Sequence, residues 1–267
     1  MPPASTSSLR ASIRLLRLSG YLLIGTTLLL GFTLSQALGR PWQSLPRIVR
    51  WWHQRVLPIL GVEVAKVTGT PVKPALIVAN HVSWLDITVL GSLIETDFLS
   101  KIEVRDWPLI GWMSAQVGTL FIKRGGNQAQ SLTDQIETRV GNGKPVVIFA
   151  EGSTSDGRQV RRFFPRLLAS ARQTGVPVQP VAIRYGTNAA PDPIAPFVGD
   201  DNLVAHGWRV LQRRATRVEV HFREPIVSEG IDRRSLAAQS RAAIAAALEV
   251  PLEPPSRPLR LGQEVAI

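Results

Sequence analysis

From residue 72 onward, short apolar runs alternate with stretches of helix length. The apolar runs cover residues 74–80, 97–101, 118–124, 145–151 and 176–185, and the helix-length stretches cover 84–95, 107–116, 128–140 and 165–173. Alternation of this kind, with strands that are apolar on both sides, is typical of a parallel sheet buried between helices. We therefore predict an α/β fold with a mostly parallel central sheet flanked by helices.

The C-terminal part adds one strand and one helix to this pattern. Residues 216–226 alternate apolar and polar positions, which predicts a late strand with one solvated face, and His221 falls on that polar face. A helix is expected over 232–248, whereas the proline-containing stretch 187–199 is expected to be a loop.

A long apolar segment occupies the N-terminal region. Residues 18–38 contain no charge over 21 positions, and as a helix they would be about 30 Å long, the thickness of a bilayer core. We predict an N-terminal membrane-anchoring helical segment; a signal peptide and a helix that enters one leaflet and returns are the alternatives. Residues 46–60 predict either an interfacial amphipathic helix or a helix packed on the domain, with His53 at the surface.

These patterns divide the chain of 267 residues into four parts. We expect a basic N-terminal tail at 1–17, membrane-anchor and interfacial helices at 18–60, a main domain at 61–250 and a flexible Pro-rich tail at 251–267.

Composition narrows the possible chemistry and partners. The chain has no cysteine, which excludes disulfides, thiolate metal ligands and cysteine nucleophiles. The net charge of +11 suits either nucleic acid or anionic lipid head groups. Since a nucleic-acid binder rarely needs a long apolar segment, we expect membrane lipids as partners and no nucleic acid.

The first candidate for chemistry lies where the apolar run 74–80 ends. If a strand ends at Asn80 and a helix starts at Ser83, the intervening turn can fold His81 back over the first helical turn, next to Asp86. An aspartate bonded to one ring nitrogen leaves the other free to take a proton from a hydroxyl, which is a general base with its orienting group. The alternative is that Ser83 and Asp86 form only a capping box.

Two further strand ends carry polar residues. Residues 118–124 end in Lys123 and Arg124 before Gly125, cations and flexible backbone that suit an anionic group. Residues 145–151 end in Glu151, before Gly152 and Ser153. The carboxyl ends of parallel strands meet at one edge of a sheet, so all these residues are expected to converge with His81.

These motifs resemble those of the glycerolipid acyltransferases, the family that includes the 1-acyl-sn-glycerol-3-phosphate acyltransferases. Residues 80–86 (NHVSWLD) resemble its His-four residues-Asp block, 121–125 (FIKRG) its second block, 149–153 (FAEGS) its third, and 178–181 (VQPV) its proline-containing fourth. Order and spacing agree over residues 76–185, less than half of the chain.

The resemblance implies acyl transfer from acyl-CoA or acyl carrier protein to a lysolipid hydroxyl. His81 would deprotonate that hydroxyl and Asp86 would orient His81. The resemblance further implies acceptor binding by Lys123, Arg124, Gly125, Glu151, Gly152 and Ser153, and donor binding by Pro180 and Val181. It implies no metal and no cofactor apart from the acyl donor, because a thioester is already activated.

One block departs from the family pattern. In the branch that forms phosphatidic acid the third block usually is Phe-Pro-Glu-Gly-Thr-Arg, whereas here Ala150 replaces the proline, Ser153 the threonine and Thr154 the arginine. That arginine is a candidate contact to acceptor phosphate. The block is similar to those of branches that acylate other lysolipids, including lyso-ornithine lipids, whose head group lacks phosphate.

We therefore predict a membrane-bound lysolipid O-acyltransferase that acylates 1-acyl-sn-glycerol 3-phosphate, with lyso-ornithine lipid as the alternative acceptor. A bacterial inner-membrane location with the catalytic domain on the cytoplasmic side is expected, because acyl thioesters are made there. The remote alternatives are a serine hydrolase that uses Ser153 or Ser155 and a non-catalytic membrane-binding module.

Overall fold

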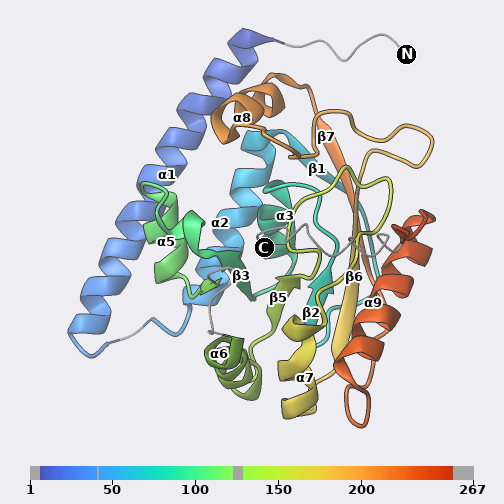
Figure 1. The fold of residues 1–267 in the computed structure, drawn as a ribbon. Helices are drawn as coiled ribbons and strands as arrows, with labels where there is room; N and C mark the ends of the chain where they lie inside the picture. Colours follow the sequence, from blue (N-terminus) through green and yellow to red (C-terminus); the bar gives the residue numbers. More distant parts are fainter. Residues whose placement is uncertain (1–6, 41, 123–128, 255–267) are drawn as a thin grey trace, which may run out of the picture.

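A seven-stranded sheet forms the centre of the protein in a computed structural model that describes residues 7–40, 42–122 and 129–254 (Figure 1). The strand order is β1-β7-β6-β2-β5-β3-β4, and neighbouring strands are parallel except for the antiparallel pair of β6 and β7. The strands are β1 Val62–Thr68, β2 Leu76–Ala79, β3 Asp97–Lys101, β4 Leu120–Ile122, β5 Val146–Phe149, β6 Val178–Tyr185 and β7 Thr216–Phe222. The predicted α/β fold with a mostly parallel central sheet is confirmed.

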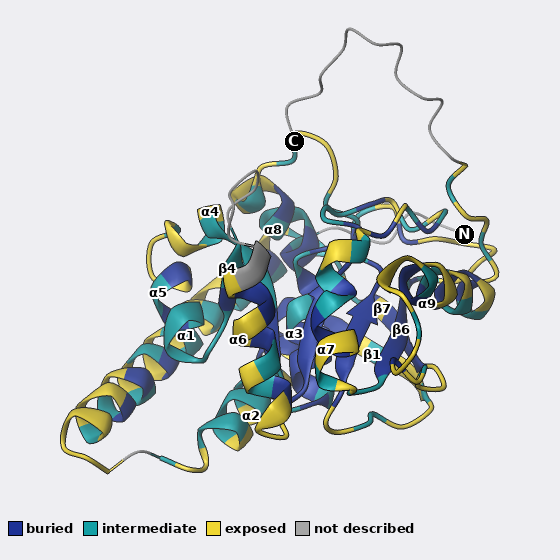
Figure 2. Cartoon of the chain, turned by 60° about the horizontal axis from the view of Figure 1, so that its bottom comes forward, coloured by how far each residue is buried: buried dark blue, intermediate teal, exposed yellow. Residues whose placement is uncertain are grey.

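Helices cover both faces of this sheet because its central strands are apolar on both sides. Every residue of β2 and β5 is buried. One face packs against α2 (Leu45–Leu60), α3 (Leu85–Leu93) and α8 (Leu203–Gln212), and the other against α6 (Ala129–Gly141), α7 (Ala169–Thr174) and α9 (Arg233–Leu248). Short helices α4 (Ile102–Arg105), α5 (Ile110–Gln116) and η1 (Pro165–Leu168) complete the described fold. Figure 2 shows buried residues concentrated on the central strands and exposed ones on the outer faces of the helices.

The strand register brings three loops to one edge of the sheet. Ala79 of β2 pairs with Phe149 of β5 on one side and with Val181 of β6 on the other. The residues that follow β2 and β5 therefore leave the sheet side by side. Residues that sequence separates by about seventy positions come together here, as the sequence predicts.

The N-terminal helix α1 (Ser8–Ala37) begins ten residues before the predicted start and lies along the domain, beside α8 and α5 (Figure 1). The Arg14 guanidinium donates hydrogen bonds to the carbonyls of Leu211 and Arg213 at 3.2 and 2.6 Å, at the C-terminus of α8. Near the other end of α1, the Thr33 hydroxyl lies 3.2 Å from Gln116 Oε1 of α5. By length and composition, α1 is the helix in the described chain that could cross a membrane.

Two histidines differ from expectation. His221 is buried rather than solvated, because β1 pairs along β7 and the Thr68 hydroxyl lies 2.9 Å from His221 Nδ1. His53 is not a surface residue, because α2 packs against α3 so closely that a Cβ on Gly91 would lie 2.6 Å from the His53 ring. Burial lowers the pKa of His53 to about 4, so the ring is neutral at pH 7.

Candidate active site

His81 and Asp86 form the predicted pair. β2 ends at Ala79, α3 begins at Leu85, and the turn between them places His81 Nδ1 2.8 Å from Asp86 Oδ2. The backbone N–H groups of Val82 and Ser83 donate to the same carboxylate oxygen at 2.8 and 3.0 Å. Asp86 therefore fixes both the turn and the imidazole. The alternative in which Ser83 and Asp86 form only a capping box is not observed, because Ser83 Oγ has no hydrogen-bond partner among the described residues and Asp86 also accepts from His81.

The surroundings of the ring leave one nitrogen available for chemistry. Asp86 is fully buried, and its carboxylate accepts from Nδ1, so the proton of neutral His81 is on Nδ1 and Nε2 is unprotonated. The ring stacks on Phe149 with centroids 3.9 Å apart and an interplanar angle of 14°. The His81 side chain is 18% exposed and lines a cleft, so Nε2 can act as a general base toward a bound hydroxyl.

Loops from neighbouring strands hold the His81 turn in place. The Asn80 amide donates to the Ile183 carbonyl at 2.9 Å and accepts from the Ile183 N–H at 2.8 Å, which joins the turn to β6. The Ser155 N–H donates to the His81 carbonyl at 2.8 Å, and its hydroxyl donates to the same oxygen at 3.2 Å. The backbone around His81 is therefore fixed from two directions.

Glu151 follows β5 and lies buried at the same edge, 4% exposed. Burial raises the pKa of Glu151 to about 8, although the backbone N–H of His81, the Ser155 hydroxyl and the charge of Arg161 oppose that rise. Neither carboxyl oxygen has a hydrogen bond of ordinary geometry to any described residue. Glu151 is thus largely protonated at pH 7, in a site where a ligand can supply the missing partner.

Gly152 and Ser153 complete this segment. Gly152 has a φ of 71°, and a Cβ there would lie 2.7 Å from the Phe164 ring, so both conformation and space favour glycine. Ser153 Oγ accepts a hydrogen bond from Arg161 Nη1 at 2.8 Å. Neither Ser153 nor Ser155 bonds to the His81 ring, so the structure gives the serine-hydrolase alternative no nucleophile–base pair.

The cleft in front of His81 has a volume of about 1900 Å³ and is lined mainly by apolar residues. Its walls come from α1, α2, α3, α5 and α8, whereas His81, Glu151, Gly152, Ser153 and Arg161 supply polar groups. An elongated apolar chain with a polar end fits such a cleft.

The remaining predicted site residues do not all gather here. Lys123, Arg124 and Gly125 lie outside the described residues, although Ile122, the last residue of β4, lines the cleft. Pro180 and Val181 are buried in the middle of β6 and are not among the lining residues, so the implied donor contact is not visible at either position. Among the described residues, no three His, Asp or Glu side chains are grouped to hold a metal ion.

Two side-chain contacts near the site were not predicted from the sequence. The Tyr185 hydroxyl donates to Asp86 Oδ1 at 2.8 Å, from 99 positions along the chain. Trp84, which lines the cleft, donates from Nε1 to His206 Nδ1 of α8 at 3.0 Å. The start of α8 had a local signal in Asn202, a good N-cap residue before an apolar-periodic run. Tyr185 had none.

Comparison with known proteins places this geometry in a family. The family model described as Acyltransferase matches residues 61–184. The lyso-ornithine lipid O-acyltransferase of Pseudomonas aeruginosa is 43% identical over 242 residues, which are 90% of this chain and 94% of that protein. The chain belongs to the acyltransferase family. The predicted family and enzyme class are thereby confirmed.

Other relatives of this acyltransferase act on a different acceptor. The 1-acyl-sn-glycerol-3-phosphate acyltransferase of Neisseria gonorrhoeae is 30% identical over 164 residues, 61% of this chain and 64% of that protein. The crystal structure of the 1-acyl-sn-glycerophosphate acyltransferase from Thermotoga maritima has the same fold, with a TM-score of 0.65 at 22% identity over 90% of this chain and 96% of that one. Both predicted acceptors therefore occur among similar proteins.

Proposed function

We propose that this acyltransferase transfers an acyl chain from acyl-CoA or acyl carrier protein to the hydroxyl of lyso-ornithine lipid. The observation that carries the proposal is the long match to the Pseudomonas aeruginosa lyso-ornithine lipid O-acyltransferase, which covers 90% of the chain at 43% identity. The third block agrees with this acceptor, because Thr154 stands where the phosphatidic-acid-forming branch usually has arginine.

The contacts of Thr154 support a head group without phosphate. The Thr154 hydroxyl donates to the Phe197 carbonyl, and the Phe197 N–H donates to the Val82 carbonyl at 2.9 Å. Position 154 thus ties the 187–199 loop to the His81 turn and adds no charge to the cleft. An ornithine head group carries an ammonium and a carboxylate, for which Glu151 and Arg161 are complementary groups in the cleft.

The reaction requires one base and an activated donor. His81 Nε2 takes the proton of the acceptor hydroxyl as its oxygen attacks the thioester carbonyl. The tetrahedral intermediate collapses with cleavage of the C–S bond, and the protonated His81 returns the proton to the leaving thiolate. Asp86 stabilises the imidazolium in between. The products are the O-acylated lipid and a free thiol.

A second acceptor, 1-acyl-sn-glycerol 3-phosphate, is the one the sequence motifs predict first, and the Neisseria relative acts on it. The test offers the detergent-purified protein each acceptor separately, with acyl-CoA and with acyl carrier protein, and follows the acylated lipid. We expect turnover of lyso-ornithine lipid to exceed that of the phosphate lipid by at least about tenfold, because a site built for one polar head leaves groups unpaired with another. Preference for the phosphate lipid, with His81→Ala inactive, would reverse the assignment.

We further propose that α1 lies in one leaflet rather than across the bilayer. Outward-facing apolar residues follow its whole length, including Leu9, Ile13, Leu16, Leu23, Leu30 and Leu34, whereas Ala11, Gly25, Leu29 and Phe32 are buried against the domain. A crossing helix of this length would carry α8 and α5 into the hydrocarbon with it. The face that carries the domain is expected to be the cytoplasmic one.

Single cysteines test this arrangement, because the chain has none of its own. Ser8→Cys and Arg40→Cys mark the two ends of α1 at exposed polar positions. We expect a membrane-impermeant thiol reagent to label both only from the cytoplasmic side, in inside-out vesicles and not in spheroplasts. Labelling of the two cysteines from opposite sides would show that α1 crosses the membrane.

A further inference from the structure

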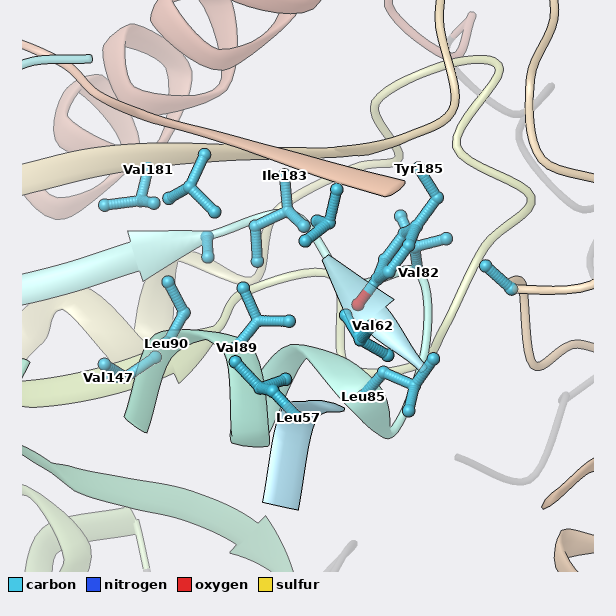
Figure 3. Packing of buried hydrophobic residues seen from close by; sticks show 14 of the residues in the cluster. Leu57, Val62, Val82, Leu85, Val89, Leu90, Val147, Val181, Ile183 and Tyr185 are labelled. Atoms are coloured by element: carbon cyan, nitrogen blue, oxygen red, sulfur yellow. The ribbon is translucent and has the colours of Figure 1, made fainter. Parts of the chain in front are cut away.

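Tyr185 is the last residue of β6, and it is buried in the apolar cluster between the sheet and α3. Figure 3 shows its ring among Val82, Leu85 and Ile183, with the hydroxyl oxygen directed toward α3. A phenylalanine would satisfy the apolar packing, but a buried hydroxyl needs a hydrogen-bond partner. That partner is Asp86 Oδ1, 2.8 Å away.

The contact completes the coordination of the Asp86 carboxylate. Oδ2 accepts from His81 Nδ1 and from the N–H groups of Val82 and Ser83, whereas Oδ1 is held by Tyr185. Bonds to Oδ2 alone would hold one oxygen and leave the orientation of the carboxylate plane undefined. The bond to Oδ1 fixes the carboxylate plane, and with it the direction in which His81 points Nε2 into the cleft.

We propose that Tyr185 is a positioning residue for acyl transfer, which acts on His81 through the orientation and charge of Asp86. The fourth block of the family pattern then has a function besides packing. Because β6 pairs in register with β2, the strand that contains Pro180 and Val181 delivers Tyr185 to the carboxylate behind the base. The proposal depends on the acyltransferase activity and not on which lysolipid is the acceptor.

Removing the Tyr185 hydroxyl changes the electrostatic interaction between Asp86 and His81. With one donor fewer, the Asp86 carboxylate attracts a protonated imidazole more strongly, so the His81–Asp86 pair holds its proton to higher pH. The acidic limb of the rate profile should therefore move upward. The titratable and charged groups around the pair are Glu151 after β5, Arg161 beyond it, Asp192 after β6 and Arg213, which lies 2.7 Å from Asp192.

The first experiment compares Tyr185→Phe with Tyr21→Phe, a matched change at the other tyrosine of the chain. Turnover of the preferred acceptor is measured between pH 5 and 9. We expect Tyr185→Phe to lower kcat about tenfold with little change in KM, and to raise the midpoint of the acidic limb by about half to one pH unit. Tyr21→Phe should leave both unchanged. An unmoved limb in Tyr185→Phe overturns the proposal, whatever happens to its rate.

A second measurement keeps the tyrosine and avoids loss of folding. In the Tyr21→Phe background, biosynthetic fluorotyrosine replaces only Tyr185, since the chain has two tyrosines. Fluorination makes the phenol a stronger donor of nearly the same size, so the acidic limb should move to lower pH, opposite to Tyr185→Phe. A limb that stays in place contradicts the proposal.

A double-mutant cycle shows whether the effect passes through Asp86. In Asp86→Asn the charge that Tyr185 orients is absent, so adding Tyr185→Phe should change the remaining rate less than about twofold. A further tenfold loss would mean that Tyr185 acts by packing or on the substrate. Thiol release gives the rate with any acceptor, so this outcome is separate from the identity of the lysolipid.

Discussion

Replacement of His81 by alanine is expected to lower kcat/KM for acyl transfer by about 10²–10⁴-fold, the usual contribution of a general base. The loss follows from geometry: Nε2 of His81 is the free nitrogen at the polar end of the cleft, and Asp86 holds Nδ1 at 2.8 Å. Asp86→Asn should produce a loss of similar order, because an amide stabilises the wrong tautomer and no longer balances the imidazolium. The measurement is thiol release from the donor in the presence of acceptor.

A matched control separates loss of the base from loss of a histidine. His221→Asn removes an imidazole from β7, where the side chain is buried against Thr68 and does not line the cleft. We expect its kcat/KM to stay within about twofold of the parent, with at most a modest loss of stability. If His81→Ala retained more than about a tenth of the activity, the base would lie elsewhere. A non-catalytic module would show no acyl transfer in the parent protein either.

The parts of the site that sequence alone predicts are those set by local pattern. An apolar run that stops at Asn80, a helix pattern that starts a few residues later and a five-residue spacing suffice to bring His81 to Asp86. The convergence with Glu151 follows from a general rule about parallel strands. The first prediction depends only on residues close together in the chain. The second depends on a parallel sheet, which the alternation of strands and helices indicates.

What sequence did not predict depends on contacts between distant segments. Tyr185 bonds to Asp86, 99 positions away in the chain, through the pairing of β6 with β2, and no sequence pattern near Tyr185 indicates that contact. The position of α1 was missed for a different reason. The leucines of α1 lie on all of its sides, so hydropathy indicates a membrane segment. The bonds from Arg14 that hold α1 along the domain go to backbone carbonyls at the end of α8, and such acceptors have no sequence signature.

The second large effect concerns Glu151 and pH. Burial raises the pKa of its carboxyl from the ordinary 4.5 to about 8 in the folded protein. Below pH 4.5 both folded and unfolded states bind the proton, and the carboxyl does not affect stability. Between about pH 4.5 and 8 only the folded state keeps it, so the free energy of unfolding falls as pH rises; above pH 8 the loss is complete. The shift corresponds to roughly 3 kcal/mol lost by pH 7.

Glu151→Gln should remove this loss, since an amide of the same shape carries no charge at any pH. We expect the variant to gain stability relative to the parent as pH rises from 5 to 8, with a difference in Tm of about 5–10 °C at the upper end. Thermal unfolding in detergent at a series of pH values measures it. Glu229→Gln, at an exposed position, is the control and should run parallel to the parent at every pH. A constant offset for Glu151→Gln would mean that the carboxyl is ionised when folded.

The gain in stability should come with weaker binding of the acceptor. A carboxyl that is buried without a hydrogen bond of ordinary geometry to any described residue weakens the empty protein, and such groups persist where a ligand compensates them. A bound ammonium beside Glu151 would draw its pKa down and convert the protonated acid to a paired carboxylate. Glu151→Gln cannot make that pair, so KM for lyso-ornithine lipid should rise about tenfold or more. A more stable variant with unchanged KM would place Glu151 outside acceptor binding.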